Sequence, residues 1–211
     1  MAELNRLNQA ILEGDAKTAA AVTKEALDAG VDPVVLIQKH MVPAMDEVGR
    51  LYEAEEYFVP ELLLAARAMK ASLELLRPLL AASGAEPAGR VVIGTVKGDL
   101  HDIGKNLVGS MLEGGGFEVI DLGADVAPDK FIEAIQTRGA RIVCLSALLT
   151  VTMPSMKKTI EALKEAGVRE QVKVLVGGAP VTPQFAEEIG ADGYGETANA
   201  AVALARRFSG E

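Results

Sequence analysis

Apolar residues in the first part of the chain recur every three or four positions, and glycine and proline are sparse there. This spacing is the period of an amphipathic helix. Residues 1 to about 81 are therefore predicted to be helical almost throughout. The period is seen first at Leu4, Leu7 and Ile11, and then at Ala19, Val22 and Ala26.

Helix-starting and helix-breaking residues divide this part into four segments. Asp15 and the pair Asp32–Pro33 are suited to begin the second and third helices, because aspartate caps a helix and proline fits its first turn. Pro43 should kink or interrupt the third helix, and the acidic run 53–56 together with Pro60 should separate it from the fourth. Four helices of this length predict a small four-helix bundle.

The later part of the chain alternates between short β-rich runs and helical segments. This alternation predicts an α/β fold with a doubly wound, parallel, five-stranded sheet of the Rossmann-like (flavodoxin-like) kind. The strands are expected at 91–96, 117–122, 142–146, 172–176 and 191–194, and the helices from about 102, 128, 154, 183 and 200.

The composition changes between the two parts, where small residues, glycine and proline replace the helical pattern. We predict a helical domain over 1–84, a linker over 85–89 and an α/β domain over 90–211.

Charge and composition exclude several classes of protein. The 211 residues carry 21 Lys and Arg against 30 Asp and Glu, a formal net charge of -9. This charge argues against binding to nucleic acid or to an anionic membrane surface. The sequence has no recognisable secretory signal, no apolar run long enough to span a bilayer, and a single cysteine, Cys144, so we expect a cytoplasmic protein.

Metal-binding side chains are scarce. Two His and one Cys cannot build the zinc sites that need several thiolates or imidazoles. Any transition-metal site must therefore take very few ligands from the protein.

The loops that follow the strands are the expected place for a ligand, because open parallel sheets bind ligands at the carboxyl ends of their strands. The first loop contains His101 beside two carboxylates, Asp99 and Asp102. His101 is either a surface histidine paired with a carboxylate or an axial ligand to a metal whose other donors belong to a macrocycle. In the same way, Gly104 and Gly177–Gly178 either form tight turns or leave room for a ligand against the backbone, and Ser146 and Thr150 either cap helices or contact that ligand.

Taken together, three elements resemble the signature of the cobalamin-binding family. The signature reads Asp-x-His-x-x-Gly, then Ser-x-Leu, then Gly-Gly, and it corresponds to Asp99, His101 and Gly104, to Ser146 and Leu148, and to Gly177 and Gly178. The helical part is similar to the cap domain of methyl-carrying corrinoid proteins, including the run 55–62.

This resemblance implies a cobalamin or related corrinoid cofactor with His101 as the lower ligand of cobalt. Asp99 would continue a hydrogen-bonded relay from His101, and Thr152 stands where methionine synthases have a serine. The nucleotide tail of the cofactor would lie against Ser146, Thr150 and the glycines, and Phe58 would lie near the upper, methyl-carrying face. The cofactor-binding residues expected on this basis are Phe58, Gly98, Asp99, Leu100, His101, Asp102, Ile103, Gly104, Ser146, Leu148, Thr150, Thr152, Gly177 and Gly178.

The function implied is that of a methyl carrier, in which the cofactor alternates between methylcob(III)alamin and cob(I)alamin. Its partners would be a substrate-specific methyltransferase and an acceptor methyltransferase that uses tetrahydrofolate or a thiol such as coenzyme M, with a corrinoid-reactivating protein as a third. The alternatives are the cobalamin subunit of an adenosylcobalamin-dependent mutase and a cobalamin-dependent sensor. The mutase does not normally carry this helical cap, and the sensor would need a basic DNA-binding segment that we do not find.

Overall fold

The computed structural model describes residues 2–83 and 87–210. The chain forms two compact units, one of residues 1–87 with 113–116 and one of residues 88–112 with 117–211. The predicted linker, 85–89, includes residues that lie outside the described ones, so the domain boundaries stay a prediction.

The first unit is helical, and its helices begin where the capping residues predict. Asp15 and Asp32 each accept hydrogen bonds from the first turn of the helix that follows, for example Thr18 N–H at 3.0 Å and Val34 N–H at 2.7 Å. The elements are α1 (Ala2–Leu12), α2 (Ala16–Asp28), α3 (Pro33–Leu36), the π-helical turn η1 (Ile37–Met41), α4 (Val42–Glu53) and α5 (Val59–Ser83).

The interruption expected at Pro43 takes the form of a π-helical turn. Proline lacks the N–H that an α-helix needs at that position, and the wider turn before it lets Val42 N–H bond to the carbonyl of Ile37. The polypeptide therefore continues helically from α3 to α4. Buried side chains such as Leu7, Met41 and Met69 fill the interior of this unit.

The second unit contains a parallel five-stranded sheet, as the sequence predicts, and its strand order is β2-β1-β3-β4-β5. They are β1 (Arg90–Thr95), β2 (Glu118–Asp121), β3 (Ile142–Ser146), β4 (Lys173–Gly177) and β5 (Gly193–Gly195). The helices are α6 (Ile103–Gly114), α7 (Pro128–Arg138), α8 (Pro154–Glu165), the 3-10 turn η2 (Arg169–Gln171), α9 (Pro183–Ile189) and α10 (Ala198–Ser209).

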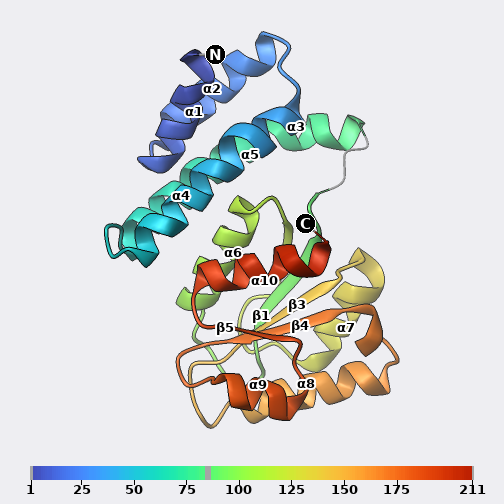
Figure 1. The fold of residues 1–211 in the computed structure, drawn as a ribbon. Helices are drawn as coiled ribbons and strands as arrows, with labels where there is room; N and C mark the ends of the chain where they lie inside the picture. Colours follow the sequence, from blue (N-terminus) through green and yellow to red (C-terminus); the bar gives the residue numbers. More distant parts are fainter. Residues whose placement is uncertain (1, 84–86, 211) are drawn as a thin grey trace. The chain divides into compact units, whose positions relative to one another are not determined.

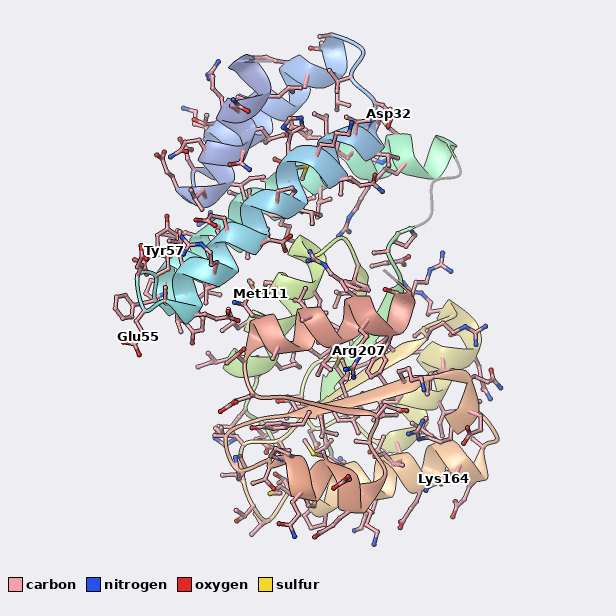
Figure 2. The ribbon with its side chains drawn as sticks, viewed as in Figure 1. Asp32, Glu55, Tyr57, Met111, Lys164 and Arg207 are labelled. Atoms are coloured by element: carbon pink, nitrogen blue, oxygen red, sulfur yellow. The ribbon has the colours of Figure 1, made fainter. Side chains whose placement is uncertain are left out.

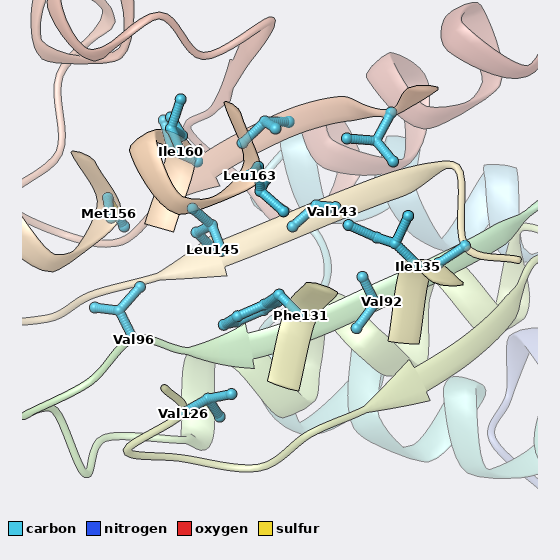
Figure 3. Packing of buried hydrophobic residues seen from close by; sticks show 14 of the residues in the cluster. Val92, Val96, Val126, Phe131, Ile135, Val143, Leu145, Met156, Ile160 and Leu163 are labelled. Atoms are coloured by element: carbon cyan, nitrogen blue, oxygen red, sulfur yellow. The ribbon is translucent and has the colours of Figure 1, made fainter. Parts of the chain in front are cut away.

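Helices cover both faces of the sheet, with α6 and α10 on one face and α7, α8 and α9 on the other (Figure 1). On the second face Phe131 and Ile135 of α7 and Leu163 of α8 pack against valines of the strands (Figure 3). Charged side chains such as Lys164 of α8 and Arg207 of α10 are exposed (Figure 2). Burial on both faces explains why β1 and β3 read as continuous apolar runs.

Candidate functional site

Three loops begin side by side at the carboxyl edge of the sheet. Strands β1, β3 and β4 end at Thr95, Ser146 and Gly177. Ser146 is paired with Thr95 on one side and with Gly177 on the other. The loops that carry the predicted site residues therefore leave the sheet from adjacent positions, as the strand pattern predicts.

Asp99 connects two of these loops through both of its carboxylate oxygens. Its Oδ1 accepts from the backbone N–H of His101 at 3.1 Å and lies 2.8 Å from His101 Nδ1. Its Oδ2 accepts from the Thr152 hydroxyl at 2.6 Å and from Leu148 N–H at 2.8 Å. The Asp99 side chain is fully buried, so its carboxylate is shielded from water.

The hydrogen bonds determine the protonation of Asp99. Burial by itself raises the pKa of Asp99, but the bonds from Thr152, His101 and Leu148 together outweigh it and leave the pKa well below its usual range. Asp99 is therefore an anion with fixed donors around it.

His101 is held from one side and open on the other. Its Nδ1 is committed to Asp99, while half of its side-chain surface is exposed. In the part of the chain that the structure describes, no hydrogen bond engages Nε2. A carboxylate on Nδ1 favours the tautomer in which Nε2 keeps its lone pair, which is the arrangement found behind metal-binding histidines.

Large apolar side chains surround this histidine in sequence and are exposed. Leu100 and Ile103 are 76% and 79% exposed, and Val151 of the neighbouring loop is 82% exposed. Leu148 is exposed to 43%. An exposed apolar set next to an available imidazole nitrogen is suited to a large planar, mostly apolar ligand.

The remaining predicted residues of the first loop lie at its surface. Gly98 has a φ of +89°, which favours glycine, and no atom lies within 4 Å of where a side chain would begin at Gly104. Asp102 is exposed, and its backbone carbonyl accepts from Asn106 N–H at 2.7 Å, which starts helix α6.

Ser146 and Thr150 are not part of the Asp99 network. The backbone carbonyl of Ser146 accepts from Val96 N–H at 3.0 Å, and Thr150 lies exposed in the following turn. Their contact with a ligand stays a prediction.

Gly177 and Gly178 are required by the backbone itself. A Cβ on Gly178 would lie 2.0 Å from the carbonyl oxygen of Ala147, and its φ is +126°. A Cβ on Gly177 would lie 2.9 Å from the carbonyl oxygen of Gly195. Neighbouring backbone already fills the space that a side chain would need, so the fold itself explains both glycines, and their contact with the cofactor tail stays a prediction.

Phe58 belongs to the first unit and is 62% exposed. It immediately precedes α5, and its N–H donates to Glu61 Oε2 at 2.9 Å. Its predicted place near the cofactor stays a prediction.

Sequence reasoning missed several groups that shape the site. The peptide N–H groups of Leu148 and Leu149 donate to Asp99 at 2.8 and 3.3 Å, a backbone role that the presence of Leu148 in the signature does not indicate. Thr95 and Asp125 hold the His101 loop from behind, and neither belongs to the signature.

The residues present fit a cofactor that brings most of its own metal ligands. Among the described residues, no three His, Cys, Asp or Glu side chains come together to hold a metal ion. Cys144 is buried in β3, and burial raises the pKa of its thiol to about 12.

The described helices include none that is long and apolar enough to cross a membrane.

Comparison with known proteins agrees with this geometry. Residues 89–203 match the family described as "B12 binding domain", and residues 3–77 match a second family with the same description. The chain belongs to the corrinoid protein family.

Corrinoid proteins of methyltransferase systems are its relatives. The chain is 49% identical over 200 residues to trimethylamine corrinoid protein 2 of Methanosarcina mazei, covering 94% of this chain and 92% of the relative. It is 44% identical over 214 residues to a corrinoid protein of Desulfitobacterium hafniense, covering 100% and 99%. A chain in the crystal structure of the methanol:cobalamin methyltransferase complex from Methanosarcina barkeri is similar with a TM-score of 0.87 and 32% identity, over 99% of this chain and 80% of that one.

Membership in the corrinoid family identifies the class of cofactor. The cofactor is cobalamin or a related corrinoid, a planar macrocycle that carries cobalt.

Proposed function

We propose that this corrinoid protein is a methyl carrier that receives a methyl group at one methyltransferase and delivers it at another. The observation that carries the proposal is the His101 imidazole, whose Nδ1 is fixed by buried Asp99 while Nε2 is left available. The bound corrinoid supplies the cobalt on which the methyl group travels.

His101 would bind the cobalt through Nε2, and Asp99 would hold the ring in place for that contact. Because Asp99 is anionic and lies 2.8 Å from Nδ1, it orients the ring and leaves Nε2 available.

Thr152 adjusts this pair. Its hydroxyl has one proton and two acceptors within reach, Asp99 Oδ2 at 2.6 Å and the carbonyl of Leu149 at 2.8 Å. Donation to Asp99 withdraws negative charge from His101, and donation to Leu149 restores it. The Thr152 hydroxyl can therefore change its acceptor when the bond between His101 and cobalt becomes stronger or weaker.

The partners we propose are those of a methyl relay. A substrate-specific methyltransferase would load the carrier, and the names of the relatives make trimethylamine and methanol the donors to test. An acceptor methyltransferase would unload it onto tetrahydrofolate or a thiol such as coenzyme M, and a corrinoid-reactivating protein would restore oxidised cofactor. We expect these steps in the cytoplasm.

The test uses the purified chain loaded with methylcobalamin and mixed with candidate methyltransferases. Methyl transfer to tetrahydrofolate or coenzyme M supports the proposal. No transfer with any partner, together with a carbon-skeleton rearrangement when adenosylcobalamin and a partner subunit are supplied, would replace it with the mutase.

A paired variant tests the ligand. His101→Ala should give a folded protein whose cofactor lacks the spectroscopic signature of nitrogen coordination by the protein. His40→Ala changes the other histidine, in the helical unit, and should leave that signature intact. An unchanged spectrum in His101→Ala would rule out His101 as the ligand.

A further inference from the structure

Asp125 holds the His101 loop on the backbone side of Asp99. It lies in the loop between β2 and α7, and its Oδ1 accepts from Gly98 N–H at 2.8 Å. Its own N–H donates to the carbonyl of Asp99 at 2.9 Å. One residue thus binds the chain just before and just after the Asp99 side chain.

The backbone of Asp125 is unusual for a residue with a side chain. Its φ is +56°, and among the described residues other than glycine only Glu55 shares a positive φ. Aspartate tolerates this region better than most residues do, yet it is rarely found there unless its surroundings hold it. In this conformation Asp125 makes its two hydrogen bonds, to Gly98 and to Asp99.

Thr95 holds the same loop at its other end. It is fully buried at the end of β1, and its hydroxyl donates to the carbonyl of His101 at 2.8 Å. Its backbone bonds to the residues on both sides of Asp125, through the carbonyl of Gly123 at 3.0 Å and the N–H of Val126 at 2.9 Å. Thr95 and Asp125 therefore form one support behind the loop.

We propose that Thr95 and Asp125 are positioning residues that fix where the His101 ring presents Nε2 to the cobalt. Neither side chain contacts the imidazole, so both act through the backbone on each side of it. The inference rests on the proposed role of His101 and adds two residues outside the family signature.

Each residue offers a matched pair of variants. Thr95→Val removes the hydroxyl at constant shape, and Thr95→Ser keeps it. Asp125→Gly removes the carboxylate in a residue that adopts positive φ freely, and Asp125→Asn keeps an oxygen for Gly98 N–H. Lys97→Met is a further control, because the exposed Lys97–Asp125 ion pair at 2.9 Å should contribute little.

The first measurement follows His101 without any cofactor. Imidazole nitrogen chemical shifts of the ¹⁵N-histidine-labelled apoprotein report which ring nitrogen carries the proton. In the wild type we expect the proton on Nδ1, facing Asp99. Thr95→Val and Asp125→Gly should move population towards the other tautomer, and Thr95→Ser and Asp125→Asn should not.

The second measurement uses the protein loaded with cobalamin in the Co(II) state. Electron paramagnetic resonance of the labelled protein separates cobalt bound to a histidine nitrogen from cobalt that is not. Thr95→Val and Asp125→Gly each lose a hydrogen bond of the support. The ratio of histidine-bound to unbound cobalt should therefore fall about threefold to tenfold in each variant. The other three variants should stay within about twofold of the wild type.

The outcomes separate this inference from the proposed function. Wild-type tautomer and wild-type ratio in both Thr95→Val and Asp125→Gly would overturn the positioning role. No histidine nitrogen on cobalt in the wild-type protein would instead overturn the proposed function. If one variant fails to fold, judged by circular dichroism, the other still decides.

Discussion

The two edges of the parallel sheet each hold a carboxylate between loops, but they surround it differently. At the carboxyl edge, Asp99 is bound by a hydroxyl, backbone N–H groups and an imidazole. At the amino edge, Asp192 lies 2.7 Å from the guanidinium of Arg169 and accepts from Val174 N–H at 2.8 Å. Lys173 adds a second cation at 3.3 Å.

The difference is the one expected if the amino edge is structural and the carboxyl edge, as proposed above, binds the cofactor. Arginine keeps its charge at every accessible pH, so the charge balance around Asp192 is fixed. The partners of Asp99 are neutral donors and the imidazole of His101, whose second ring nitrogen is left available to a ligand. An edge that must respond to its ligand needs the second kind of partner.

The largest effect should follow from Asp99→Asn. The donors around Asp99 use both of its carboxylate oxygens, whereas an asparagine side chain offers only one oxygen. Leu148 N–H or the Thr152 hydroxyl would therefore face an NH₂ group in a buried site. We expect a loss of about 2–4 kcal/mol in the stability of the second unit and loss of nitrogen ligation by His101. Hydrogen exchange of the β3 amides measures the first, and electron paramagnetic resonance of the loaded protein measures the second.

Asp192→Asn is the corresponding change at the amino edge. The loss of a charge-assisted bond should lower the stability of the second unit by about 1–3 kcal/mol, also seen by hydrogen exchange. Lower ligation of cobalt should be unchanged. Altered ligation in this variant would mean that the two edges are not independent.

A smaller effect is expected from Thr152→Val, which removes one bond to Asp99 and preserves shape. Stability should fall by about 1–2 kcal/mol while most of the cofactor stays bound. The balance between ligated and unligated cobalt should shift, which a redox titration followed by visible absorption measures. Thr152→Ser should restore the wild-type balance, and complete loss of cofactor in Thr152→Val would point to a different role.

The pH dependence of stability is the subtlest contrast. Because the pKa of Asp99 is lowered on folding, its contribution is complete above its unfolded value, near 3.8, and is lost as the pH falls further. The difference in free energy of unfolding between wild-type apoprotein and Asp99→Asn should therefore narrow below about pH 4. Urea denaturation across the acid range checks this, and a constant difference would contradict the anionic state of Asp99.

The sequence predicted the regular elements well because they depend on local patterns. The strand expected at 91–96 is β1, Arg90–Thr95, and Asp32 caps α3 with Pro33 at its first position, since apolar runs and helix capping are visible in neighbouring residues. The type of interruption at Pro43 was not predictable, because a π-helical turn depends on which carbonyl Val42 N–H selects.

The site was predictable only where side chains carry it. Asp99, His101 and the glycine pair could be named from a spaced signature. Asp125 could not, because its importance comes from a positive φ and from contacts across a loop. Thr95 likewise reads as one more β-branched residue in a strand, and its bond to the His101 carbonyl appears only after folding.

Cys144 has a practical consequence for studying how a carrier serves two partners. A thiol buried in the sheet with a pKa of about 12 should resist maleimide reagents near neutral pH. Cysteines introduced at exposed Lys17 in the helical unit and exposed Lys158 in the α/β unit would then be the reactive ones. Fluorophores attached there could report single-molecule energy transfer between the units during turnover, with the native cysteine left in place.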